Sequence, residues 1–316
     1  MRNILRNVTD FICNTPLIEL SHTWNGDGQN GRLLAKMEFI QPGCSVKDRA
    51  ALQIIKDAYK NGRLTEGQPV VEMTSGNMGA GLAVVCRAMG NPFIAAMSEG
   101  NSIERVKILK ALGAEVVRVP QVDGTPGMVT GSDIAKAVEK ALEIARQKNC
   151  FYVDQFNNPS NVAGHYLTTG PEIWSDLDGN IDAFIASVGT GATFVGTSRF
   201  LKEQRKSIFC APAEPEEAAI LKKGFVVNPK HIIQGTGYGM IPPQWDPALV
   251  DDVITVTDEE VEQQTRLLAR DEGLYVGYSS GANVCAALKL LKSGILKGNP
   301  VVVTVLCDTA YKYSTL

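Results

Sequence analysis

The chain has 316 residues, of which 44% are hydrophobic and 21% charged, a composition typical of globular proteins. With 31 basic and 34 acidic residues, the formal net charge of −3 excludes a strongly basic surface for nucleic acid or anionic membranes as its main function. The apolar runs are strand-sized, and the N-terminal sequence MRNILRNVTDF lacks the apolar stretch of a secretory signal. We therefore expect an enzyme or binding protein of about two domains.

Cysteine and histidine usage gives no sign of a metal site. The seven cysteines form no CxxC or CxxH pair, and the three histidines are widely scattered, so no bound metal is predicted. Free cysteines are typical of a reducing cytoplasm, which is the predicted location. Cys44 is the exception whose role stays open, because it lies in the segment QPGCSVKDR. His165 is expected to be a hydrogen-bonded structural residue.

Short apolar runs alternate with helical segments along the chain. The runs predicted as strands are PVVEM from Pro69, PFIAAM from Pro92, EVVRV from Glu115, FYVDQF from Phe151, IDAFIASV from Ile181, SIFCA from Ser207 and VVVTVLC from Val301. Nearly continuous apolar strands that alternate with helices predict an α/β fold with parallel sheets covered on both faces.

Two helices carry clear local signals. An apolar stripe of about four turns predicts a helix through Ile134, Val138, Leu142 and Ala145. Thr257, with Glu260 three residues later, predicts a capping box at the start of another.

Polar and glycine-rich segments indicate the connections. A domain boundary is predicted near residues 145–150, and residues 121–133 are expected to form an exposed loop. Residues 228–247 are too long and too rich in Gly and Pro for an ordinary connection, which indicates a functional or mobile loop.

Several glycines lie where a strand passes into a helix. VVEMT leads into SGNMGAG (75–81), IDAFIASV into GTGAT (189–193) and GLYVGY into SSGAN (279–283). Backbone N–H groups at a helix start bind anions, and ligands of α/β sheets lie at the carboxyl ends of strands. Each junction alone can also be a plain turn, because Gly, Ser and Asn commonly begin helices.

One junction leaves a second function class open. Gly189 and Gly191 resemble the start of a dinucleotide-binding fingerprint, and Glu214 could bind a ribose. Phe194 stands where the third glycine of that fingerprint belongs. A nicotinamide-dependent oxidoreductase is therefore the alternative from another class.

A set of segments in a fixed order covers nearly the whole chain: NTPLIEL, QPGCSVKDR, TSGNMG, QFNNPSNVAGHYLTTGPEIW, GTGAT, GTGYGMIPP, VGYSSGAN and DTAYKY. It resembles the fold-type II pyridoxal-phosphate (PLP) enzymes, specifically the cysteine synthase (O-acetylserine sulfhydrylase) and cystathionine β-synthase family. The resemblance implies an α/β fold of two domains, each with a mostly parallel sheet flanked by helices, as in tryptophan synthase β. It implies a smaller mobile domain (38–148) with the substrate-carboxylate loop, and a larger one (1–37 plus 149–316) with the phosphate loop.

The resemblance also implies roles for individual residues. Lys47 would form the Schiff base with pyridoxal 5'-phosphate and then act as the base for the substrate α-proton. Asn77 would bind the 3-hydroxyl of PLP, and Ser279 would face its pyridine nitrogen. The phosphate loop would comprise Gly189, Thr190, Gly191, Ala192 and Thr193. The substrate residues would be Thr74, Ser75, Met78, Gly79, Gln155, Gly235 and Tyr238.

The implied reaction is a β-replacement on a β-substituted L-alanine through an aminoacrylate, with cysteine made from O-acetylserine and sulfide. Four positions differ from the commonest cysteine synthase pattern: Gln41, Cys44, Met78 and Tyr238. Met78 and Tyr238 together suggest an alternative that uses cysteine or serine: a sulfide-releasing lyase, a β-cyanoalanine synthase or a cystathionine β-synthase-like enzyme. The implied partners are a second copy in a homodimer and, as an open possibility, a serine acetyltransferase.

Overall fold

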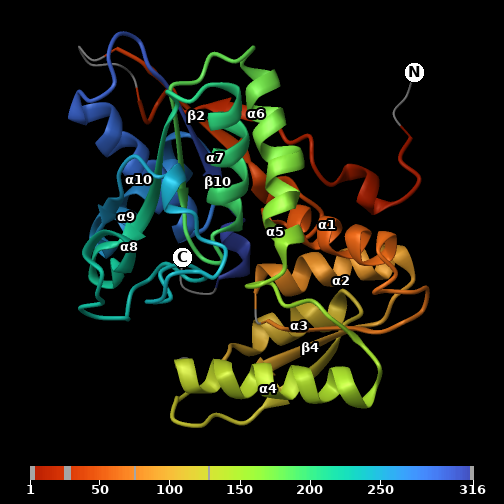
Figure 1. Cartoon of the computed structure of the whole chain (residues 1–316). Helices are drawn as coiled ribbons and strands as arrows, with labels where there is room; N and C mark the ends of the chain where they lie inside the picture. Colours follow the sequence, from red (N-terminus) through yellow and green to blue (C-terminus); the bar gives the residue numbers. More distant parts are fainter. Residues whose placement is uncertain (1–3, 25–29, 75, 127–128, 314–316) are drawn as a thin grey trace. The chain divides into compact units, whose positions relative to one another are not determined.

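The computed structural model describes residues 4–24, 30–74, 76–126 and 129–313, shown in Figure 1. The chain divides into two compact units. Unit 1 comprises Met1–Ile12 and Gln41–Asn161, and unit 2 comprises Cys13–Ile40 and Val162–Leu316. These limits differ from those of the predicted domains, 38–148 and 1–37 plus 149–316, which remain a prediction.

Unit 1 contains a parallel sheet of four strands in the order β5-β4-β3-β6. Its main elements are α1 Lys47–Lys60, β3 Val70–Met73, α2 Asn77–Met89, β4 Phe93–Ser98, α3 Ile103–Ala111, β5 Glu115–Val119, α4 Gly131–Gln147 and β6 Phe151–Tyr152. Helix α4 packs on β3 and β4, and α1 packs against α2, which also contacts β4. Figure 1 shows β4 with α4 on one side and α2 on the other.

Helix α4 confirms the predicted helix, but the residues of the predicted apolar stripe, Ile134, Val138, Leu142 and Ala145, are only half-buried. Its core side is formed by Ala141 and Ile144, which pack with Val71, Ile94 and Ala96 of the sheet. The helix begins within the predicted loop 121–133, because Thr130 and Asp133 form a capping box. Asp133 is buried rather than exposed, and hydrogen bonds from backbone amides lower the pKa of its carboxyl group.

Strand β6 is much shorter than the strand that was predicted from the run FYVDQF. It pairs in parallel with β3, Phe151 opposite Val70 and Tyr152 opposite Val71. This pairing places the chain that follows it, up to Asn161, with unit 1.

Unit 2 contains a sheet of six strands in the order β1-β2-β10-β7-β8-β9. Of its strand pairs only β1–β2 is antiparallel. Its strands are β1 Leu17–Glu19, β2 Arg32–Met37, β7 Ala183–Ser187, β8 Phe209–Pro215, β9 Ile254–Val256 and β10 Val301–Leu306. Its helices are α6 Gly170–Asp176, α7 Ala192–Gln204, α8 Ile220–Lys223, α9 Asp258–Asp271 and α10 Tyr278–Ser293, with α5 Pro159–Gly164 at the boundary between the units.

Helices cover both faces of this sheet. Helix α10 packs on β7 to β10, and α9 packs against α10. Helix α7 packs on β7 and contacts α6. Figure 1 shows α9 beside α10, and α6 beside α7. The capping box predicted at Thr257 and Glu260 opens α9. Short helical turns complete the chain: η1 Val8–Phe11, η2 Glu38–Ile40, the π-helical turn η3 His165–Thr169, η4 Glu216–Ala218, η5 Pro247–Leu249 and η6 Ala310–Lys312.

The predicted α/β fold with mostly parallel sheets is thus confirmed. Among the described residues no helix is both long and apolar enough to span a membrane.

Candidate active site

Lys47 is the first residue of α1 and is half-buried. The turn before it is held by a hydrogen bond from Cys44 N to Gln41 O (2.7 Å) and by one from Gly43 N to the Asp48 carboxylate. A Cβ on Gly81 of α2 would lie 3.2 Å from the Lys47 carbonyl, so glycine there lets α2 approach the backbone of Lys47 closely. Local packing therefore fixes the backbone that carries this amine.

Cys44 has a left-handed backbone conformation, with φ +57°. A side chain in this conformation is strained, and the hydrogen-bonding contact of the thiol to the described residues is a long one, 3.9 Å to Pro42 O. We expect Cys44→Gly to raise the free energy of unfolding by up to about 1 kcal/mol, measured by urea denaturation. Cys150→Gly is the control and should destabilise, because Cys150 has no such strain. A loss of stability in Cys44→Gly would refute the strain.

The segment after β3 forms the start of α2. Thr74 is buried, and its hydroxyl accepts a hydrogen bond from Gly79 N (3.0 Å). Asn77 is the first residue of α2 and is half-buried. Met78, the second residue of α2, is 3% exposed, and its side chain carries no hydroxyl. Ser75 lies outside the described residues.

Gln155 follows β6 in a tightly bonded segment of unit 1. Its carbonyl accepts a hydrogen bond from Asn161 Nδ2 (2.7 Å), and Asp154 before it has a φ of +53°. The Gln155 Nε2 atom donates to Glu72 Oε1 (3.2 Å) and to Met73 O (3.3 Å). Gln155, the predicted binder of the substrate carboxylate, is therefore hydrogen-bonded to the end of β3.

Glu72 was not singled out by the sequence analysis, although a charged residue inside the apolar run PVVEM is an available signal. Its side chain is 1% exposed, and within the described part of the chain Oε2 has no hydrogen-bond partner. Burial raises the pKa of Glu72 to about 8, and the negative charge of Asp154 adds to this shift, whereas the Gln155 hydrogen bond opposes it. Glu72 is therefore mostly a neutral acid at neutral pH.

The segment Gly189–Thr193 in unit 2 connects β7 to α7. Gly191 is the N-cap of α7 with φ +84°, a conformation that favours glycine. Thr190, Ala192 and Thr193 are all buried. The loop thus offers backbone amides and two threonines at the N-terminus of a 13-residue helix, the donor set that suits a phosphate dianion.

A second glycine-rich segment of unit 2 lies against this loop. Gly237 N donates to Val188 O (3.1 Å), and a Cβ on Gly189 would overlap the carbonyl oxygen of Gly235. The same Cβ would lie 3.7 Å from the ring of Tyr238, which is 45% exposed. The structure thus brings Gly235 and Tyr238 next to Gly189.

Ser279 is the second residue of α10 and is half-buried. The start of this helix is bonded to two strand ends: Ser187 N at the end of β7 donates to Asn283 Oδ1 (2.6 Å), and Cys307 N after β10 donates to Ser280 Oγ (2.9 Å). Ser279 therefore lies at the same sheet edge as the loop that follows β7. Asn283, which holds this junction together, was missed as a positioning residue within SSGAN.

His165 is buried in the π-helical turn η3, next to the segment Gly189–Thr193. Its Nδ1 hydrogen-bonds with Thr169 Oγ1 (2.8 Å) and its Nε2 with Thr193 Oγ1 (3.2 Å). It is thus the hydrogen-bonded structural residue that the sequence predicts, and it orients the hydroxyl of Thr193.

The residues of the dinucleotide alternative have other roles. The Glu214 carboxylate accepts hydrogen bonds from Leu221 N (2.9 Å) and Lys222 N (3.1 Å), and burial raises its pKa. Phe194 is fully buried, and its ring stacks with Phe184 and Trp245. The carboxylate holds the start of α8, and the phenyl ring fills the core.

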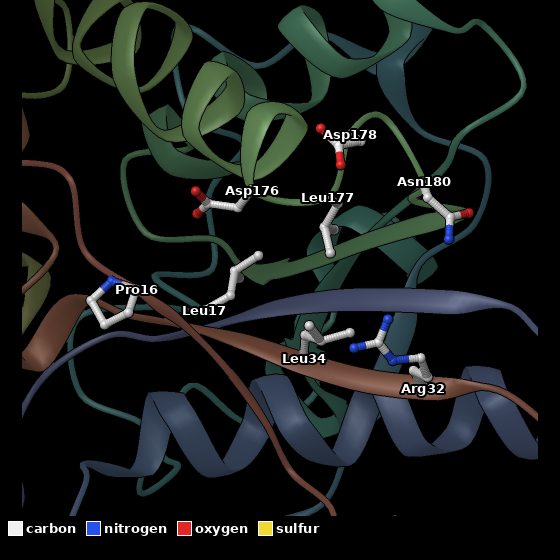
Figure 2. A pocket seen from close by; sticks show the side chains of 8 residues that line it. All are labelled: Pro16, Leu17, Arg32, Leu34, Asp176, Leu177, Asp178 and Asn180. Carbon is white, nitrogen blue, oxygen red and sulfur yellow. The ribbon is translucent and has the colours of Figure 1, made fainter.

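A cavity of about 460 Å³ in unit 2 contains none of the predicted site residues (Figure 2). In Figure 2 the side chains of Asp176 and Asp178 lie on one side and those of Arg32 and Leu34 on the other. Arg32 pairs with Glu19 (2.8 Å), and Asp176 pairs with Lys36 (3.0 Å). The remaining lining residues are Pro16, Leu17, Leu177 and Asn180.

Each unit offers groups that suit a phosphorylated carbonyl cofactor: unit 1 a lysine amine at a helix start, and unit 2 a loop for a dianion and a serine at the edge of its sheet. The profile of the family described as "Pyridoxal-phosphate dependent enzyme" matches residues 8–308. The chain belongs to this family. The predicted family and the cofactor, pyridoxal 5'-phosphate, are thus confirmed, and the enzyme is of the cysteine synthase kind.

Individual members of the family resemble the chain over nearly its whole length. Cysteine synthase A of Escherichia coli is 40% identical over 311 residues, 96% of this chain and 92% of that protein. Cysteine synthase 3 of Caenorhabditis elegans is 39% identical over 297 residues, 94% of this chain and 85% of that protein. The solved structure of a hydrogen sulfide-producing enzyme from Fusobacterium nucleatum superposes with a TM-score of 0.89 at 34% identity, covering 99% of both chains.

Proposed function

We propose that this PLP-dependent enzyme is a cysteine synthase, which converts O-acetylserine and sulfide into cysteine and acetate. The observation that carries the proposal is the 39–40% identity to cysteine synthases over more than nine-tenths of the chain. The lysine and the phosphate loop at helix starts support it, because they supply the two attachment points that the cofactor needs.

In this proposal Lys47 is the catalytic residue. Its amine would hold the cofactor through a covalent bond, and once released it is the base that takes the substrate α-proton. Bound PLP supplies an electron sink for the α-carbon. As the α-proton passes to Lys47, acetate leaves with the C–O electron pair, and hydrosulfide then adds at the β-carbon. Lys47 returns its proton when cysteine is released.

Other residues bind and orient. Gly189–Thr193 hold the cofactor phosphate, Asn77 its 3-hydroxyl, and Ser279 its pyridine nitrogen. A neutral hydroxyl at that nitrogen gives a weaker electron sink than a carboxylate would, which favours β-elimination over transamination. The substrate carboxylate is bound by the segment Thr74–Gly79 and by Gln155, while Gly235 and Tyr238 contact the β-substituent.

A second candidate function is β-elimination or β-replacement that starts from cysteine or serine. Three observations support it: Met78 supplies no hydroxyl at the start of α2, Tyr238 is 45% exposed beside Gly189, and a structural relative is named a hydrogen sulfide-producing enzyme. Products of this candidate include sulfide, β-cyanoalanine and cystathionine.

The experiment supplies O-acetylserine, serine or cysteine to the holoenzyme, each with sulfide, cyanide, homocysteine or water. Amino-acid products are identified by mass spectrometry, and released sulfide is measured separately. A cysteine synthase forms cysteine fastest from O-acetylserine and sulfide. Faster turnover of cysteine or serine would replace the proposal with the second candidate.

The cellular setting belongs to the same proposal: a cytoplasmic homodimer with a smaller mobile domain, for which a serine acetyltransferase is the candidate partner. The family resemblance supports these features. Sedimentation of the purified protein, alone and with a serine acetyltransferase, tests the dimer and the partner. A monomer that does not bind would contradict both.

A further inference from the structure

The side-chain amide of Gln155 is oriented in a way that matters for substrate binding. Its nitrogen donates to Glu72 Oε1 and to Met73 O, so both N–H bonds of the amide are used. Only the amide oxygen is then left, and an oxygen cannot donate to a carboxylate. In this orientation Gln155 therefore has no N–H group left to donate to a substrate carboxylate.

The orientation follows from the partners. Met73 O is a backbone carbonyl and only accepts, so a flipped amide would place oxygen against oxygen. The backbone on both sides of Gln155 is also fixed, by Asn161 Nδ2 on its carbonyl and by Asn158 Nδ2 on Val153 O (2.8 Å). Only the side chain of Gln155 can turn without breaking the segment.

We propose that Glu72 is a positioning residue, which holds the Gln155 amide in a resting orientation until the substrate carboxylate takes over its hydrogens. The inference rests on the proposed function, in which Gln155 binds that carboxylate. Glu72 competes with the substrate for the same donors, so a stronger Glu72–Gln155 hydrogen bond means weaker substrate binding.

Ionisation of Glu72 sets the strength of this competition. A carboxylate accepts a stronger hydrogen bond than a neutral acid does, and burial places this change at a pKa of about 8. The charged group that acts on Glu72 is Asp154, which raises the same pKa. The Tyr152 hydroxyl also faces these charges: its own pKa is raised mainly by burial and further by the charges of Glu72 and Asp154. Substrate affinity should therefore fall above about pH 8.

The test measures the binding of L-alanine, which has an α-carboxylate and no leaving group, to the holoenzyme between about pH 7 and 9. The cofactor absorbance reports binding, and KM and kcat are measured with the best substrate. Between about pH 7 and 9 the dissociation constant of L-alanine should change in the two proteins by factors that differ about tenfold. The larger rise belongs to the wild type, because the side chain of Glu72→Gln stays neutral. KM should rise with the dissociation constant while kcat stays unchanged.

Two further variants separate the possible failures. Glu115→Gln, an exposed glutamate on β5 of the same sheet, should follow the wild-type curve. If Gln155→Ala leaves the L-alanine affinity unchanged, the role of Gln155 in the proposed function fails. If Gln155→Ala weakens binding but the wild type and Glu72→Gln share one pH curve, the role of Glu72 alone is refuted.

A further variant and a stability measurement keep the inference testable if Glu72→Gln folds poorly. Glu72→Met removes the acceptor and should bind L-alanine more tightly than the wild type, without the change near pH 8. Because its pKa is raised, Glu72 binds a proton more tightly in the folded than in the unfolded protein. This adds to the free energy of unfolding, fully below pH 4.5, the ordinary pKa of Glu, and the contribution is lost as the pH rises through about 8. Thermal unfolding of the wild type should show this loss and that of Glu72→Met should not; equal slopes would overturn the inference.

Discussion

Lys47→Ala is expected to lower turnover by at least about 10³-fold, because the variant loses both the covalent attachment of the cofactor and the base for the α-proton. Lys47 begins α1 with a backbone fixed by the Gly43–Asp48 hydrogen bond and by the close approach of Gly81. Turnover with O-acetylserine and sulfide, and the visible absorbance of the bound cofactor, measure the effect.

Lys56→Ala is the matched control, an exposed lysine on the same helix. It should retain both turnover and cofactor absorbance. Circular dichroism of both variants shows whether α1 is intact. A folded Lys47→Ala that keeps the wild-type absorbance and rate would refute the assignment of the catalytic lysine.

Gly189→Ala is expected to weaken PLP binding by about 5- to 150-fold, the range that overpacking of about 1–3 kcal/mol produces. The added methyl group overlaps the carbonyl oxygen of Gly235, a backbone atom that cannot move like a flexible side chain. The loop before α7 must then shift away from the segment bonded to Val188. Titration of the apoenzyme with PLP measures the dissociation constant.

Gly131→Ala is the control for this substitution. Gly131 begins α4, has no atom within 4 Å of the added Cβ and has no positive φ. It should keep the wild-type affinity for PLP. Unchanged cofactor affinity in Gly189→Ala would show that the two glycine-rich segments are not packed as described.

Local sequence signals predicted the elements that they themselves form. The predicted capping box at Thr257 depends on atoms three residues apart and is present, whereas the equivalent box at Thr130 was missed because its segment was predicted as a loop. Continuous apolar runs predicted β4 and β10, because a parallel strand is buried on both faces. Strand β2 was missed, since Lys36 interrupts its apolar run and forms its ion pairs with Glu172 and Asp176, which lie far along the chain.

The sequence by itself determined the α/β class, the glycine-rich helix starts and the family with its cofactor, because these depend on residue type at short spacing and on motif order. Only the tertiary structure decided which residues of each unit meet. It placed Gly235 on Gly189, bonded the start of α10 to the ends of β7 and β10, and brought Glu72 to Gln155, 83 residues away. Such contacts, and the raised pKa of Glu72 that burial causes, depend on the packing of distant segments, which no local pattern encodes.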